Sequence, residues 1–332
     1  MEATNTQLLF FGHLKNSLAP HLSLVDEVAE RLNISNDSAY RRIRGEKAIS
    51  FDELRVLCIY YRISLDQFLH LQSDTFIFSG KLKSESNTVF EDYLNDVLKN
   101  FQVINSCKKK HVYYLMKDIP PFVHFQVPEL SLFKCFFWMK SILHDDRLKA
   151  VKFSFDDPRY LPFIDISKKI IEVYNKIPIT EIWNVESINS SLNQINIYRQ
   201  SGSFKNVEDI ILLYDKVEEL INHIEKQAEL GVKFYIGTEP KNDAAEYRMF
   251  VNELVMGDNT VLAELDNTRI TFLNHSVLYF IGTRDEKFNK AMFTNIDNLM
   301  KKSTMISSVS EKERLAFFNQ LRDKISKYRN ML

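Results

Sequence analysis

Glycine is scarce in this chain, with eight among 332 residues. The spacing of these glycines forms neither the GxGxxG fingerprint of dinucleotide-binding folds nor a P-loop, which argues against a phosphate cradle built from a glycine-rich loop. The catalytic patterns G-x-S-x-G and H-E-x-x-H do not occur either. We therefore expect a protein that is not an enzyme, although active sites that assemble only in three dimensions leave no such pattern.

Cysteine is also rare and forms no CxxC pair; the three cysteines are Cys58, Cys107 and Cys135. An odd number of widely separated cysteines predicts no disulfide framework and favours the reducing cytoplasm. The other side chains of metal-ligating type are His111, His124 and the string His144-Asp145-Asp146. Together with Cys107 and Cys135 they match no zinc-binding spacing, so we expect neither a metal nor a cofactor.

Long apolar runs are missing as well. The most apolar segment, residues 130–143, is interrupted by Lys134 and Lys140 and is too short to cross a bilayer. The first residues, MEATNTQLLFFGHLK, have an acidic second position and only a brief apolar run, unlike a signal peptide. We expect a cytoplasmic protein with no membrane partner.

The chain has almost no net charge, since 43 Lys and Arg residues face 44 Asp and Glu residues. A general attraction to nucleic acid or to an anionic membrane is therefore not indicated. The first 75 residues carry eight cationic and ten acidic side chains, and four of those cations lie between Arg41 and Lys47. If this part binds DNA, its positive charge is concentrated on one element.

What the chain does contain is an ordinary supply of core residues, with 45% hydrophobic and 12% aromatic side chains. Its length allows two or three domains. Composition divides it into a first domain over residues 1–72, a linker over residues 73–89 rich in Ser, Lys and Thr, and a larger region over residues 90–332. The predicted fold class is mainly α with some β structure (α+β).

Residues 24–69 read as four short helices in a row, each preceded by a serine that can cap it. Ser23 and Ser35 precede the first two, and Ser50 and Glu53 form a capping box for the third. Asn33 follows Leu32, and asparagine tolerates the left-handed backbone of a sharp turn between helices. With an earlier helix ending before Pro20, this predicts a five-helix domain.

The same segment resembles the lambda-repressor-like helix-turn-helix family, the xenobiotic-response-element type of transcription regulator. The resemblance covers about a fifth of the chain and rests on Ala29, the turn LNIS at 32–35, the helix ending at Arg44-Gly45, and the ending ISFDELRVLCIYYRISLDQFL. The family usually has glycine where Asn33 stands and an aliphatic residue where Arg42 stands. The second departure leaves open whether Arg41 or Arg42 faces the bases.

This resemblance implies a sequence-specific, DNA-binding transcription regulator that acts as a homodimer on double-stranded DNA. The base- and backbone-reading positions of the family fall on Ser35, Asn36, Asp37, Tyr40, Arg41 and Arg44. Arginine can hold guanine and asparagine can hold adenine through paired hydrogen bonds. The alternative interpretation is an ordinary solvated face, with Arg42 paired to Glu27 or Glu46.

The larger region is expected to be helical over residues 90–235, with a small antiparallel β-meander over residues 247–282 and a C-terminal helix over residues 311–330. The expected helices cover 89–102, 130–143, 185–199 and 207–230, with a possible strand at 111–116. The meander strands are expected at 249–256, 260–265 and 269–273, with 277–281 as a possible extension. Ser310 and Glu313 suggest a capping box for the last helix.

This region is expected to dimerise, to bind an effector of unknown class, or both. The terminal helix (315–328) offers a dimer interface or packs within the chain. The helix at 132–140 lines a pocket or an interface, or it fills the core. Lys108-Lys109-Lys110 contacts DNA phosphates or forms a solvated turn, and His275 is expected to be structural.

Three rival functions remain open. One is a peptide-sensing regulator with a helical receptor domain, and another is a protein-interaction module that never meets DNA. The third is an enzyme joined to a DNA-binding domain, which a buried cluster of ionisable side chains with shifted pKa values would favour.

Overall fold

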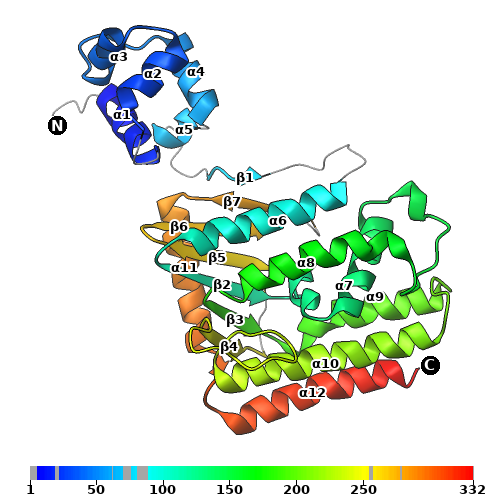
Figure 1. Ribbon diagram of the computed structural model, residues 1–332. Coiled ribbons are helices and arrows are strands. Elements are labelled where there is room, and N and C mark those ends of the chain that lie inside the picture. Colours follow the sequence, from blue (N-terminus) through cyan, green and yellow to red (C-terminus); the bar gives the residue numbers. More distant parts are fainter. Residues whose placement is uncertain are drawn as a thin grey trace. The chain divides into compact units, whose positions relative to one another are not determined.

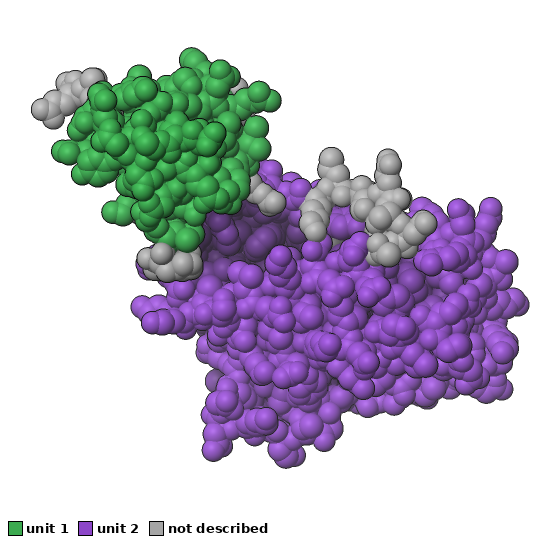
Figure 2. All heavy atoms as spheres, turned by 45° about the horizontal axis from the view of Figure 1, so that its top comes forward, with its two compact units in different colours: residues 1–77 green, residues 78–332 purple. Residues whose placement is uncertain are grey.

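The computed structural model describes residues 6–18, 22–61, 63–69, 76–80, 89–253, 257–276 and 279–331. The chain divides into two compact units, residues 1–77 and 78–332 (Figure 2). Most of the predicted linker (73–89) and parts of the predicted strands at 249–256 and 277–281 lie outside the described residues.

The first unit is built from short helices around a small apolar core. The helices are α1 Thr6–Ser17, α2 Leu24–Leu32, α3 Asn36–Ile43, α4 Phe51–Tyr61 and α5 Leu65–Phe68 (Figure 1). The fully buried core residues are Phe10, Phe11, Leu14, Val28, Ala29, Ala39 and Leu57. Ala29 of α2 and Ala39 of α3 both lie in this core, and their small side chains allow the two helices to approach closely.

The predicted caps of α2, α3 and α4 are confirmed. The hydroxyl of Ser23 accepts from the N–H of Asp26, and that of Ser35 accepts from the N–H of Ser38 at 3.3 Å. In the capping box of α4, Glu53 N–H donates to Ser50 Oγ at 3.2 Å, and Ser50 N–H donates to Glu53 Oε2 at 3.0 Å. These bonds satisfy backbone donors that a helix start would otherwise leave unpaired.

The second unit contains a mixed β-sheet of eight described strands in the order β1-β7-β6-β5-β2-β3-β4-β8. The strands are β1 Ser79–Gly80, β2 Lys110–Met116, β3 Ile179–Trp183, β4 Tyr247–Val251, β5 Thr260–Leu265, β6 Thr268–Asn274, β7 Phe280–Thr283 and β8 Thr304–Met305. Strands β2, β3 and β4 are parallel, and all other neighbours are antiparallel.

Helices connect the parallel strands and cover both faces of the sheet (Figure 1). The long helices are α6 Val89–Ser106, α7 Pro128–Phe137, α8 Leu161–Tyr174, α9 Asn189–Gln200, α10 Glu208–Leu230, α11 Glu286–Lys301 and α12 Glu311–Arg329. Short 3-10 helices span Pro121–Gln126, Asp146–Leu148, Pro158–Tyr160 and Val185–Ile188, and a π-helix, Trp138–Ile142, continues α7. None of the described helices is both long and apolar enough to span a membrane.

Alternation along the strands creates two separate cores. Val112, Tyr114 and Met116 of β2 point into the larger core, which α6, α7, α8, α10 and α12 complete. Tyr113 and Leu115 point to the other face, where Phe293 and Ile296 of α11 cover the sheet. Successive side chains of a strand face opposite ways, so one short strand serves both cores.

Two expectations about this region are wrong, and one long helix was missed. Residues 90–235 are not purely helical, because β2 and β3 lie within them, and β3 was not predicted. The meander is β5-β6-β7, whereas β4 pairs in parallel with β3. The helix α11 was not predicted either. Strand β4 is apolar at most positions because both of its faces are buried, and this pattern is typical of parallel strands rather than of a meander.

The C-terminal helix packs within the chain. Phe318, Leu321 and Ile325 of α12 are fully buried, and α12 lies alongside α10 (Figure 1). Arg322 Nη1 binds Glu225 Oε2 at 2.6 Å between these two helices. Of the two alternatives for this apolar stripe, a dimer interface or packing within the chain, the second is confirmed. The capping box at Ser310 is also wrong, since Ser310 has a left-handed backbone and its side chain caps nothing.

Candidate nucleic-acid interface

Helix α3 buries one side and leaves the other free. Ala39 is fully buried and Arg42 is 5% exposed. The six residues predicted to contact DNA are all exposed: Ser35, Asn36, Asp37, Tyr40, Arg41 and Arg44. Residues four apart lie on one face of a helix, so Asn36, Tyr40 and Arg44 form one row, and Asp37 and Arg41 form the adjacent row.

The turn before α3 depends on Asn33. Its backbone has φ 52° and ψ 51°, the left-handed conformation, and its N–H bonds the carbonyls of Ala29 and Glu30. Asparagine is one of the few residues other than glycine that adopt this conformation readily.

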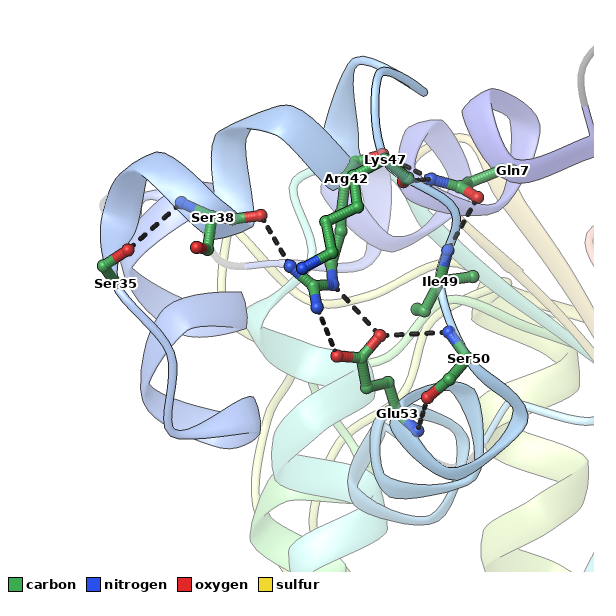
Figure 3. Close-up of polar contacts among 8 residues, drawn as sticks. All are labelled: Gln7, Ser35, Ser38, Arg42, Lys47, Ile49, Ser50 and Glu53. Atoms are coloured by element: carbon green, nitrogen blue, oxygen red, sulfur yellow. Dashed lines mark hydrogen bonds and ion pairs between the residues drawn. The ribbon is translucent and has the colours of Figure 1, made fainter.

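Arg42 connects the buried side of α3 to α4 (Figure 3). Its Nε and Nη2 donate to the two carboxylate oxygens of Glu53 on α4, at 3.0 and 2.5 Å, and its Nη1 donates to the carbonyl of Ser38 at 3.0 Å. The expected partners Glu27 and Glu46 are thus wrong. Because Arg42 points inward and Arg41 is exposed, Arg41 is the arginine available to a ligand.

The carboxylate of Glu53 has two structural roles. It completes the α4 capping box through Ser50 and receives the fork of Arg42. The hydrogen bonds from Arg42 lower the pKa of Glu53 below its ordinary value, and burial opposes them. Paired bonds of this kind fix both distance and orientation, so α3 and α4 are locked together.

Gln7 of α1 fixes the segment between α3 and α4 (Figure 3). Its Nε2 donates to the carbonyls of Arg42 and Lys47 at 2.7 and 2.8 Å, and its Oε1 accepts from the N–H of Ile49 at 3.0 Å. No local pattern indicates this role, because the hydrogen bonds span 35 to 42 residues. For Glu53, the local pattern reveals the capping role alone.

The outward groups are held only loosely. Asn36 Nδ2 donates to Asp26 Oδ1 at 2.9 Å, and Arg44 Nε lies 3.5 Å from Glu46 Oε1 with its guanidinium over the ring of Tyr40. Exposed pairs of this kind contribute little free energy, so a ligand can replace them at small cost. The charges facing out along α3 and the following turn are Arg41, Arg44 and Lys47 against Asp37 and Glu46.

The side chains of metal-ligating type do not converge. Among the described residues, no three of His, Cys, Asp or Glu are placed to share an ion. His111 Nε2 instead bonds Thr180 Oγ1 at 2.8 Å, and His275 stacks on Tyr279. In the Lys108-Lys109-Lys110 string, Lys110 Nζ binds the carbonyl of Asn105 at 2.6 Å, which leaves Lys108 and Lys109 exposed.

Two buried clusters of ionisable groups lie in the second unit, and neither was predicted. In the first, Glu181 of β3 accepts from Tyr174 Oη, Tyr247 Oη and Trp183 Nε1 at 2.6–2.8 Å. Lys233 lies 3.9 Å from this carboxylate, and burial lowers the pKa of Lys233 to about 8. Each oxygen of Glu181 has a partner, which is typical of a charge kept for structure.

The second cluster centres on Ser191 of α9. Its hydroxyl lies 2.8 Å from His124 Nε2 and 2.9 Å from Lys134 Nζ. Burial lowers the pKa of Lys134 to about 7 and lowers the pKa of His124 well below its ordinary value. This is the kind of cluster that would favour an enzyme, but Ser191 is 3% exposed and does not line the neighbouring cavity.

Comparisons of the chain with protein-family models, with curated proteins and with solved structures found no match. A function must therefore be inferred from the residues and their geometry.

Proposed function

We propose that this protein is a sequence-specific DNA-binding transcription regulator that places α3 in the major groove. The observation that supports this best is that the two sides of α3 differ in burial. Arg42 is buried against Glu53, while Asn36, Tyr40 and Arg41 remain exposed on the opposite side. A helix that is anchored on its buried side and exposes polar side chains on the other side can contact base edges in the major groove.

The outward side chains suit the roles proposed for them. Arg41 can hold O6 and N7 of guanine, and Asn36 can hold N6 and N7 of adenine after leaving Asp26. Arg44 and Lys47 lie farther along the same side, where they can bind phosphates. The N–H groups at the start of α3 add phosphate donors beside Ser35, although Ser35 Oγ already accepts from Ser38.

A single copy would bind one short half-site. Proteins of this design act as dimers on two half-sites about one helical turn of DNA apart. We therefore propose a homodimer. Because the stripe on α12 is buried within the chain, the interface must lie elsewhere.

Selection of bound fragments from random genomic DNA tests this function. We expect an enriched site with two related half-sites, and the double variant Tyr40→Ala with Arg41→Ala should lose that binding at least about 100-fold, since each good base contact contributes about 1–3 kcal/mol. Arg55→Ala, an exposed arginine on α4, is the matched control and should bind as the wild type does. No enriched site, or unchanged affinity of the double variant, would contradict the proposal.

A second candidate is a protein-interaction module. Helix α4 exposes Phe51, Ile59 and Tyr60, with Phe51 88% and Ile59 68% exposed. Exposed apolar side chains gathered on one helix are typical of protein contacts. If Phe51→Ser with Ile59→Ser abolishes assembly or partner binding in a chain that selects no DNA site, this second function is favoured.

A further inference from the structure

The second unit contains a cavity of about 420 Å³. Its walls come from the end of β2, from α7 and the π-helix after it, from α9, and from the ends of β5 and β6. The lining residues include Lys117, Asp118, Lys134, Trp138, Gln194 and Asn274. Small-molecule sites commonly have volumes of about 300–1,000 Å³, so this cavity is large enough for a ligand.

The cavity lies where ligands usually bind in sheets with parallel strands. Lys117 and Asp118 directly follow β2, the strand at which the parallel part of the sheet meets the antiparallel part. Side chains beyond the carboxyl ends of parallel strands face the crevice in which such folds bind ligands. The position of the cavity is therefore independent support for a binding site.

Lys134 supplies a buried amino group to this cavity, and this group is a cation when it is protonated. It is 4% exposed, and its Nζ donates to Ser191 Oγ at 2.9 Å and to Gln194 Oε1 at 2.7 Å. An ammonium group has three N–H donors, so one is left without a hydrogen-bond acceptor among the described residues. A carboxylate on a ligand would supply that acceptor and would offset the cost of burying the charge.

Two side chains with hydrogen-bond acceptors, Asp118 and Asn274, line the same cavity. The side chain of Asp118 has no hydrogen-bond donor among the described residues, and burial raises the pKa of Asp118. Asn274 Oδ1 is buried and likewise lacks a donor in the described part of the chain. Buried acceptors without donors are rare in folded proteins, so Asn274 Oδ1 indicates a missing donor group, and the partly exposed carboxylate of Asp118 lines the same cavity.

The remaining wall is apolar. Phe137 and Trp138 come from the segment that was expected either to fill the core or to line a pocket, and it does both. Ile119 and Ile142 extend this surface. A ligand that fits must therefore carry an apolar group beside its charged groups.

We infer that this cavity binds a small zwitterion with an apolar side chain, of the class of free α-amino acids. The carboxylate of the ligand binds Lys134, its ammonium group binds Asp118 and Asn274, and its side chain lies against Trp138. This inference goes beyond the proposed function and does not depend on it, because every residue involved belongs to the second unit.

Calorimetric titration of the full chain with each common amino acid tests the inference without DNA. We expect an apolar amino acid to bind, and Lys134→Met and Asp118→Asn should each weaken binding about 10- to 100-fold, the value of a hydrogen bond to a charged group. Lys169→Met, which changes an exposed lysine on α8, is the matched control and should bind as the wild type does. Circular dichroism verifies that each variant is folded.

Ligand derivatives provide a second test on the unaltered protein. N-acetylation removes the ammonium group and amidation removes the carboxylate, and each change should weaken binding at least about tenfold. Equal binding of the acetylated acid would show a simple anion site and would overturn the inference. So would absence of binding by every amino acid at millimolar concentration. Tyr40→Ala with Arg41→Ala should bind the amino acid normally, which separates this test from that of DNA recognition.

Discussion

Neighbouring arginines with the same chemistry have opposite roles in this protein. Arg41 and Arg42 adjoin in the sequence, but successive residues of a helix point in directions that differ by about 100°. Arg42 therefore faces Glu53 in the interior, and Arg41 faces solvent. The ion pair between Arg42 and Glu53 therefore fixes which side of α3 faces the interior.

The pair Arg42–Glu53 should stabilise the first unit strongly. Removing one partner of a buried ion pair costs about 3–5 kcal/mol, and Glu53 is 22% exposed, so we expect Arg42→Ala to cost about 2–3 kcal/mol. Arg42→Leu with Glu53→Leu should recover part of this loss, because no charge is left unpaired, although the hydrogen bond from Ser50 N–H to Glu53 at the start of α4 is lost. Denaturant dependence of hydrogen exchange in residues 36–61 measures both values, and equal losses in the single and double variants would contradict this account.

The same pair predicts the response to acid. The pKa of Glu53 is lowered in the folded protein, so its contribution is fully present above the ordinary value near 4.5. It is lost as pH falls through the lowered pKa.

Lys134 should make the free energy of unfolding of the second unit depend on pH in the alkaline range. Its pKa is about 7 when folded and near 10.5 when exposed, so between these values the unfolded chain binds the extra proton. The free energy of unfolding, measured relative to Lys134→Met, should therefore rise as pH increases from 7 toward 10 and stay level below 7. Asp118 and His124 face the same lysine; burial raises the pKa of Asp118 and lowers the pKa of His124 well below its ordinary value. A constant difference across pH would contradict the shifted pKa.

At the scale of elements, the caps of α2, α3 and α4 and the turn at Asn33 were predictable, whereas the start of α12 and the strand pairing were not. Ser35, Ser50 and Asn33 act on backbone groups within a few residues, so their roles appear in the local sequence. Strand β3 has five residues, all buried, and a short buried run does not distinguish a strand from a helix. The partner of β4 lies more than 60 residues earlier, beyond any local signal.

The end of α10 depends on a glycine in two ways. Gly231 has φ 70°, and a Cβ there would overlap Ser308 Oγ. Gly202, after α9, has φ 63° with free space around it. We expect Gly202→Ala to cost about 1–2 kcal/mol for the left-handed backbone alone, and Gly231→Ala to cost more. In a Ser308→Ala background the excess should vanish when thermal unfolding is compared, and an unchanged excess would show that the overlap is not its cause.

At the scale of the whole molecule, the chain has almost no net charge, so any binding of DNA must come from a local group of cations. Affinity for the selected site should fall steeply with salt, because Arg41, Arg44 and Lys47 of each copy would release counterions from DNA. Lys47→Gln should reduce the slope of log affinity against log salt by about one for each DNA phosphate that this lysine binds in the wild type. A flat salt profile would favour the protein-interaction module.

The sequence by itself determined the capped helices of residues 24–69, the turn at Asn33 and the residues exposed along α3, because these follow from hydrogen bonds and spacing within a few residues. Tertiary structure alone decided that Arg42 turns to Glu53, that Gln7 holds the turn beyond α3, and that α12 packs on α10. It also brought Asp118, Lys134 and Asn274 to one cavity. These outcomes depend on contacts between segments that are far apart in the sequence. The free energy of such contacts comes from burying charged and apolar groups together, and no pattern within a few residues predicts it.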